Sequence, residues 1–143
     1  ESLNDAIDFY KNQNGEFSEE FSEEMFCTLY ALQFKISRAY EKNGDIRGTG
    51  MKAVFDFFFS LKVKERITPT FTLISGNTKI QFDINDKKYY NEGILIFNDD
   101  NNFFREQIRK NVFKLKNFFP GTIISLNFGI EDSWLKETEK NEQ

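Results

Sequence analysis

The sequence predicts an α/β (α+β) two-layer sandwich, in which a mostly antiparallel sheet is covered on one face by helices. Three observations predict this fold: apolar residues recur every three or four positions early in the chain, the period becomes alternating after Pro69, and turn-forming residues separate the later segments. The chain has 143 residues, the length of one domain. We therefore expect one domain over residues 1–130, followed by a polar C-terminal tail over 131–143.

Four helices are predicted from the period of the apolar residues. They cover residues 1–10, 18–41, 51–63 and 103–118. Ser18 can cap the second helix, because a serine hydroxyl accepts hydrogen bonds from the free N–H groups of a first turn. Phe104, Ile108 and Val112 recur at intervals of four in the last helix, which Pro120-Gly121 would end.

Four strands are predicted at residues 71–75, 79–84, 93–97 and 122–128. Gly76-Asn77 stands between the first two and is typical of a hairpin turn. Helices and antiparallel strands in this order place the helices together on one face of the sheet.

Composition excludes several functional classes. The chain has no histidine, which removes serine–histidine triads and histidine general bases, and its single cysteine excludes an internal disulfide. The net charge of −4 argues against general affinity for nucleic acid. No segment has the length and apolar character of a membrane span or a secretion signal, so we expect no membrane contact and a cytoplasmic location. The 18 phenylalanines predict an aromatic core and a buried interface.

The candidate binding motif is Arg47-Gly48-Thr49-Gly50-Met51, which opens the helix predicted at 51–63. Two glycines one residue apart let the backbone approach a bound group closely. The helix that follows directs its unpaired N–H groups and positive dipole end at the same point. A phosphate tail would fit there, and the alternative is a plain turn between two helices.

The order of motifs resembles the C-terminal half of the ATP-binding domains of the histidine-kinase-like (GHKL) superfamily. The resemblance runs over about residues 36–128 and includes Gly48-Thr49-Gly50-Met51, Ile74-Ser75-Gly76-Asn77 and Phe119-Pro120-Gly121-Thr122. Met51 replaces the usual leucine of the Gly-x-Gly-Leu motif. The resemblance implies that backbone N–H groups of Gly48, Thr49 and Gly50 hold the triphosphate of ATP. It places Thr122 near the adenine and Arg47 next to the phosphates, where Arg47 is equally explained as a surface charge.

Two further motifs of that superfamily are incomplete. One is a Glu-x-x-x-Asn helix, in which glutamate positions water and asparagine binds Mg²⁺. Residues 1–8 resemble this helix, with Glu1 as the candidate base and Asp5 as the candidate Mg²⁺ ligand; an ordinary amphipathic helix is the alternative. The other is Asp-x-Gly-x-Gly, which reads adenine and has no clear counterpart here. Because this run and the strand pair that should precede it are both missing, we expect the chain to be a fragment or a degenerate domain; its start at Glu1 and not at a methionine also suggests part of a longer protein.

Three functions follow from these patterns. The first is an ATP-binding domain that acts as an ATP-driven switch in a larger protein, with Mg²⁺ as cofactor and a possible ATPase activity in the full-length context. The second is a degenerate, non-catalytic relative that serves in dimerisation or partner binding, with Phe57, Phe58 or Phe59 at the interface. The third is an unrelated α+β protein-interaction factor, in which Gly48 to Gly50 is only a turn. We expect ATP and a protein partner or a second copy as the binding partners.

Overall fold

A computed structural model describes residues 2–33 and 49–130 of the chain. It contains helices and a mostly antiparallel arrangement of strands, which confirms the predicted fold class. In chain order the elements are α1 (Leu3–Asn14), α2 (Glu23–Ala31), α3 (Thr49–Ser60), β1 (Thr70–Asp83), the 3₁₀ helix η1 (Ile84–Tyr89), β2 (Tyr90–Asn91), β3 (Ile94–Leu95) and β4 (Val112–Asn127). None of the described helices is both long enough and apolar enough to cross a bilayer.

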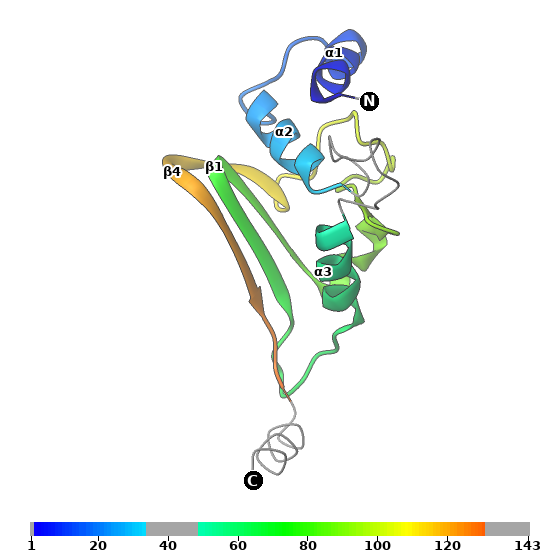
Figure 1. The fold of residues 1–143 in the computed structure, drawn as a ribbon, viewed down its shortest axis with the longest axis vertical. Helices are drawn as coiled ribbons and strands as arrows, with labels where there is room; N and C mark the ends of the chain where they lie inside the picture. The colour runs from blue at the N-terminus through cyan, green and yellow to red at the C-terminus, as the bar shows by residue number, and fades with distance from the viewer. Residues whose placement is uncertain (1, 34–48, 131–143) are drawn as a thin grey trace, which may run out of the picture.

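The long strands β1 and β4 form an antiparallel pair, and the short strands β2 and β3 form a second one. Figure 1 shows α2 and α3 on one face of the β1–β4 pair, as the two-layer arrangement predicts. The opposite face of this pair carries no helix within the described residues.

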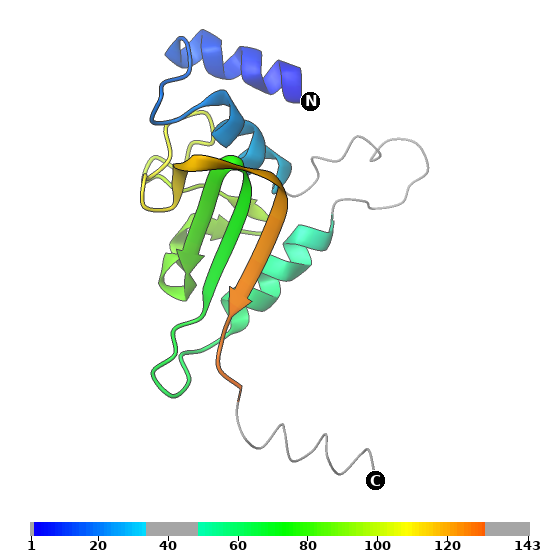
Figure 2. The ribbon, with the colours of Figure 1, turned by 90° about the vertical axis from the view of Figure 1, so that its left-hand side faces the viewer.

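Strand β1 is sharply bent (Figures 1 and 2), and its pairing with β4 is irregular around Gly76, where the sequence predicts a hairpin. Its two limbs bring the rings of Phe71 and Phe82 into a stacked contact, with 4.6 Å between their centroids. Gly76 has a φ of +58°, which glycine adopts without strain. Strand β4 follows the bend, and the β1–β4 register shifts on both sides of Gly76. The predicted hairpin is therefore wrong: residues 71–75 and 79–84 belong to one continuous strand, both limbs pair with β4, and Gly76-Asn77 is a bend between them.

Helix α2 is hydrogen-bonded to the apex of the bend in β1. The Glu24 carboxylate accepts a hydrogen bond of 2.7 Å from the backbone N–H of Asn77. A side chain on Gly76 would collide with the same carboxylate and would also meet the Phe118 ring. The apex thus requires glycine for two reasons, its backbone angle and the close approach of α2.

The core is aromatic, as the phenylalanine content predicts. Phe55 and Phe58 of α3 are fully buried and contact the Phe71–Phe82 pair of β1 edge to face. Phe59 stacks on Tyr90, with 5.0 Å between ring centroids. These contacts place α3 against the bent strand β1, whereas Phe57, the first residue of the run 57–59, is 48% exposed.

The helix predicted at 103–118 is wrong. Residues 98–111 form turns, and β4 begins at Val112. Asn98 and Asn102 explain the difference, because Asn98 Nδ2 donates to the Asn102 carbonyl at 2.8 Å and Asn98 Oδ1 accepts from the Asn102 N–H at 3.0 Å. Such side-chain bonds to the backbone compete with helical ones. Pro120-Gly121 consequently lies inside β4, at the shift in register, and ends no helix.

Other element boundaries also differ from prediction, among them the end of α2, which lies at Ala31. Helix α2 begins after Ser22, whose Oγ accepts from the Met25 N–H at 3.3 Å, while Ser18 only closes the preceding turn by accepting from Phe21. The part of the predicted helix beyond residue 33 lies outside the described residues. The strand predicted at 93–97 is reduced to Ile94–Leu95, paired with a strand that was not predicted, Tyr90–Asn91. The helices expected at 1–10 and 51–63 are confirmed as α1 and α3.

Candidate functional site

The described part of the glycine motif forms the first turn of α3. Thr49 and Gly50 are its first two residues, and Met51 packs against the aromatic core. Arg47 and Gly48 lie outside the described residues. Figure 2 shows this first turn of α3 projecting beyond the edge of β4, on the side away from β1.

Gly50 has no structural reason of its own to be glycine. It lies in a helix, it is absent from the glycines with positive φ, and a Cβ atom built on it would have no neighbour within 4 Å. Glycine in a helix costs about 0.5–1 kcal/mol relative to alanine. The described residues thus give no packing reason for a glycine at this position, and the space around its Cα is open.

Thr122 lies in β4, directly opposite Ser75 of β1. The two hydroxyl oxygens are 3.1 Å apart, within hydrogen-bond distance, and both side chains are accessible to solvent. The segments Ser75-Gly76 and Gly121-Thr122, which are 47 residues apart in the chain, thus meet at one place on the sheet. Their meeting follows from the bend that β1 and β4 share.

Asp5, the candidate Mg²⁺ ligand, caps helix α1. Its Oδ2 accepts hydrogen bonds from the Ser2 backbone N–H at 2.9 Å and from the Ser2 hydroxyl at 2.8 Å. These bonds hold the pKa of the Asp5 carboxyl below its usual value. No cluster of three or more metal-ligating side chains occurs in the part of the chain that the structure describes. Glu1, the candidate base, lies outside that part.

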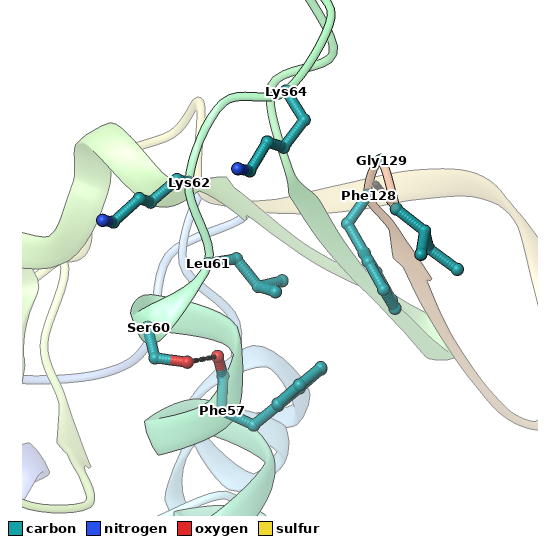
Figure 3. A pocket seen from close by; sticks show the side chains of 8 residues that line it. Phe57, Ser60, Leu61, Lys62, Lys64, Phe128 and Gly129 are labelled. Carbon is teal, nitrogen blue, oxygen red and sulfur yellow. Dashed lines mark hydrogen bonds between the residues drawn. The ribbon is translucent and has the colours of Figure 1, made fainter. Parts of the chain in front are cut away.

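An apolar cavity of about 260 Å³ lies between the C-terminal end of α3 and the exit of β4 (Figure 3). Phe57 forms one wall and Phe128 the other, with their rings edge to face and 5.8 Å between centroids. Phe57 is 48% exposed although it sits in a run of three phenylalanines whose other members are buried. The cavity is lined by Phe57, Ser60, Leu61, Lys62, Lys64, Phe128, Gly129 and Ile130.

Of these lining residues, the sequence predicted only Phe57, as one of three interface candidates. The helical period could have separated the three, because Phe55, Phe58 and Phe59 share one face and Phe57 lies on another. Phe128 and the two lysines carried no motif. Their position depends on how the chain leaves β4 and α3, which local sequence does not reveal.

A second, more polar cavity of about 350 Å³ lies beside η1. The buried Asp86 carboxylate accepts from the Asp83 backbone N–H at 3.1 Å and from Asn111 Nδ2 at 3.3 Å, and Lys110 is 3.5 Å away. Asn111 Nδ2 also donates to the Gln81 carbonyl at 3.0 Å. These bonds cap η1 and tie it to the start of β4, so the cluster has a sufficient structural role.

Helix α3 is anchored by charge as well as by its phenylalanines. The Asp56 carboxylate pairs with Lys52 and accepts a hydrogen bond from the Tyr90 hydroxyl. The pKa of Asp56 is lowered by Lys52 and then by Tyr90. Burial first, and Asp56 second, raise the pKa of Tyr90.

The chain was compared with protein families, curated proteins and solved structures. No model of a protein family, no curated protein and no solved structure shows significant similarity to the chain.

Proposed function

We propose that the chain is an ATP-binding module of the histidine-kinase-like type, which acts as an ATP-driven switch in a larger cytoplasmic protein. Gly50 carries this proposal, because an unstrained helical glycine with open space around it suits close approach by a phosphate group better than it suits folding. The N-terminus of α3 supplies backbone N–H groups that have no partner within the helix, and the positive end of a helix dipole.

The meeting of Ser75-Gly76 with Gly121-Thr122 is a second support. Both segments belong to the resemblance with the superfamily, in which a late strand that begins with a glycine–threonine pair closes the sheet. Their pairing in register, with hydroxyls 3.1 Å apart, agrees with that expectation. Thr122 would then stand toward the adenine and Gly48, Thr49 and Gly50 around the triphosphate, with Arg47 beside it.

Magnesium would serve by neutralising charge on the phosphates of bound ATP. Asp5 is the residue of this chain proposed to hold it, through Oδ1, because both bonds from Ser2 go to Oδ2. Glu1 would act as the base toward water in the full-length protein. Since no Asp-x-Gly-x-Gly run reads the adenine, we expect negligible ATP hydrolysis by the chain alone.

The test is a calorimetric titration of ATP, with and without Mg²⁺, against this chain and against the full-length protein. We expect saturable binding that Mg²⁺ strengthens, and little phosphate release. Binding by neither protein would refute the proposal. Steady phosphate release by the chain that Glu1→Ala abolishes would instead show that the N-terminal helix is catalytic.

Partner binding is the second candidate function, as a degenerate relative or an unrelated α+β interaction factor. One observation favours it, the half-exposed Phe57 in an apolar cavity. Phe58 and Phe59 are buried in the core, so of the three interface candidates Phe57 is the one available to a partner. A Phe57→Ala variant that keeps ATP affinity but loses a partner or a dimer would separate this function from nucleotide binding.

A further inference from the structure

Asn14 and Gly15 form the C-terminal end of α1. Asn14 is the last residue of the helix, and Gly15 caps it with a φ of +82°. Both residues are exposed to solvent. An asparagine that precedes glycine is prone to lose its side-chain amide, because glycine has no side chain to hinder the attack of its backbone nitrogen on the asparagine Cγ. The end of α1 therefore carries a chemically reactive pair.

Three hydrogen bonds restrain this pair. The Gly15 backbone N–H donates to the Lys11 carbonyl at 2.8 Å. Asn14 Nδ2 donates to the Tyr10 carbonyl at 2.9 Å and to the Phe104 carbonyl at 2.8 Å. Both partners of Nδ2 are carbonyl oxygens, which only accept hydrogen bonds, so they determine which side-chain atom is the nitrogen. These bonds must open before the Gly15 nitrogen attacks Cγ and Nδ2 leaves.

The bond from Asn14 to the Phe104 carbonyl also docks α1 on the segment 98–111. The Phe9 ring lies edge to face against the Phe104 ring, with 4.5 Å between their centroids. Figure 1 shows α1 at one end of the molecule, with this segment beside it. The reactive amide is therefore one of the contacts that hold α1 in place, and local opening of α1 would release it.

Loss of the amide would turn this contact into a repulsive one. A carboxylate in its place has no N–H to donate, so the Tyr10 and Phe104 carbonyls would lose their donor and face a negative charge. That charge would also lie at the C-terminal end of a helix, where the helix dipole disfavours it. Lys11 is the basic residue of this last turn, and it already pairs with Glu16 at 3.4 Å and Glu23 at 3.3 Å.

We propose that Asn14 is a deamidation site, that docking of α1 controls the reaction, and that the product makes undocking permanent. When α1 opens, the Gly15 nitrogen gives up its proton and bonds to Asn14 Cγ. The Cγ–Nδ2 bond breaks, and Nδ2 leaves as ammonia with that proton. Water then opens the succinimide ring at either carbonyl and leaves aspartate or isoaspartate. The reaction needs only water, so the inference is independent of nucleotide binding.

Peptide mass spectrometry of the whole chain measures the reaction over time in mildly alkaline buffer, with the chain either native or denatured in guanidinium chloride. We expect Asn14 to deamidate at least about tenfold more slowly in the native chain, because the reaction waits for local opening. Asn43-Gly44, the other Asn-Gly pair of the sequence, measures the reactivity of such a pair in the same denatured sample. Equal rates at Asn14 in the two states, or no reaction in either, would overturn the proposal.

Phe9→Ala tests the control by docking, because it removes the ring contact with Phe104 and leaves the reactive pair unchanged. Phe57→Ala is the matched control, since Phe57 is 48% exposed against 43% for Phe9 and also makes an edge-to-face ring contact. We expect Phe9→Ala to speed deamidation of native Asn14 at least about threefold and Phe57→Ala to leave the rate unchanged. An unchanged rate in Phe9→Ala would refute control by docking, and an equal rise in both variants would assign the effect to global stability instead.

Asn14→Asp tests the effect of the product on docking. Gln13→Glu is the control, because it makes the same change from amide to carboxylate at the neighbouring exposed residue. In hydrogen–deuterium exchange we expect the amides of α1 to exchange at least about tenfold faster in Asn14→Asp than in the parent, while those of α3 stay protected and show that the variant folds. Gln13→Glu should leave both helices as they are in the parent. Equal exchange of α1 in Asn14→Asp and the parent would refute permanent undocking.

Discussion

Replacing Gly50 with alanine separates the two explanations of the glycine motif. Gly50 is helical, and a Cβ atom there has open space within 4 Å, so the methyl group meets no obstacle in the chain. Alanine should therefore stabilise the protein by about 0.5–1 kcal/mol, from its higher helix propensity and the reduced entropy of the unfolded chain. This corresponds to a rise in melting temperature of about 1–4 °C. If phosphate oxygens contact the Cα of Gly50, the same methyl group should weaken ATP binding at least about tenfold, or about 1.4 kcal/mol.

Calorimetry measures both quantities on one sample, as the melting temperature and the dissociation constant for ATP with Mg²⁺. Ala53→Gly is the matched control, because Ala53 is an exposed residue of the same helix. It should lose a similar amount of stability and keep the affinity for ATP. A Gly50→Ala variant that is stabilised but binds ATP as the parent does would remove Gly50 from the phosphate site. A destabilised variant would show that this glycine is needed for folding, and the reasoning from open space would fail.

The remaining predictions concern the contacts that hold the elements together. Glu24→Ala should lower the free energy of unfolding by about 1–2 kcal/mol in a denaturant titration, because the Asn77 N–H at the bend in β1 loses a charged acceptor 2.7 Å away. An unchanged free energy of unfolding would mean that this bond does not stabilise the bend. Gln33→Ala should cost about 2–3 kcal/mol by thermal unfolding, because the buried Gln33 amide bonds both backbone groups of Leu95, at 2.8 and 3.1 Å; an unchanged melting temperature would contradict this. The raised pKa of Tyr90 gives stability that is fully present below pH 10 and is lost as pH rises above it. The free energy of unfolding of Tyr90→Phe should therefore fall less steeply with pH than that of the parent between about pH 10 and 12, as measured by circular dichroism. Identical slopes for the two proteins would argue against this coupling.

The sequence predicts those elements whose periodic pattern agrees with their packing. Helix α3 is predictable because the helical repeat of Phe55 and Phe58 places them against the face of β1 that carries Phe71 and Phe82. Here the local preference and the tertiary contact favour the same structure.

In the segment 103–118 the periodic pattern predicts the wrong structure. Its apolar residues fit a helical period, but Asn98 and Asn102 bond their neighbours' backbone groups, and Val112 onward pairs with the second limb of β1. The pairing partner lies more than 30 residues away in the chain, so a local period cannot reveal it. The length of β4 and the strand status of Pro120-Gly121 depend on that distant partner.

Only part of the candidate site could be proposed from local sequence. Thr49 and Gly50 are recognisable because they immediately precede an amphipathic helix, and Thr122 because it follows a Pro-Gly pair in an apolar strand. The cavity between Phe57 and Phe128 was not predictable, because two chain segments about 70 residues apart form it only where α3 packs beside the end of β4. A local motif can suggest a phosphate site, whereas a cavity between distant segments forms only in the assembled fold.

The most direct test of nucleotide binding is a two-dimensional NMR titration of the ¹⁵N-labelled chain with ATP and Mg²⁺. If backbone N–H groups at the start of α3 hold the triphosphate, the amide signals of Thr49, Gly50 and Met51 should shift most, and adenosine at equal concentration should leave them in place. The opposite result would be amides of the first turn that do not move at saturating ATP, or shifts confined to other parts of the chain. It would contradict the central claim that this helix N-terminus binds phosphate.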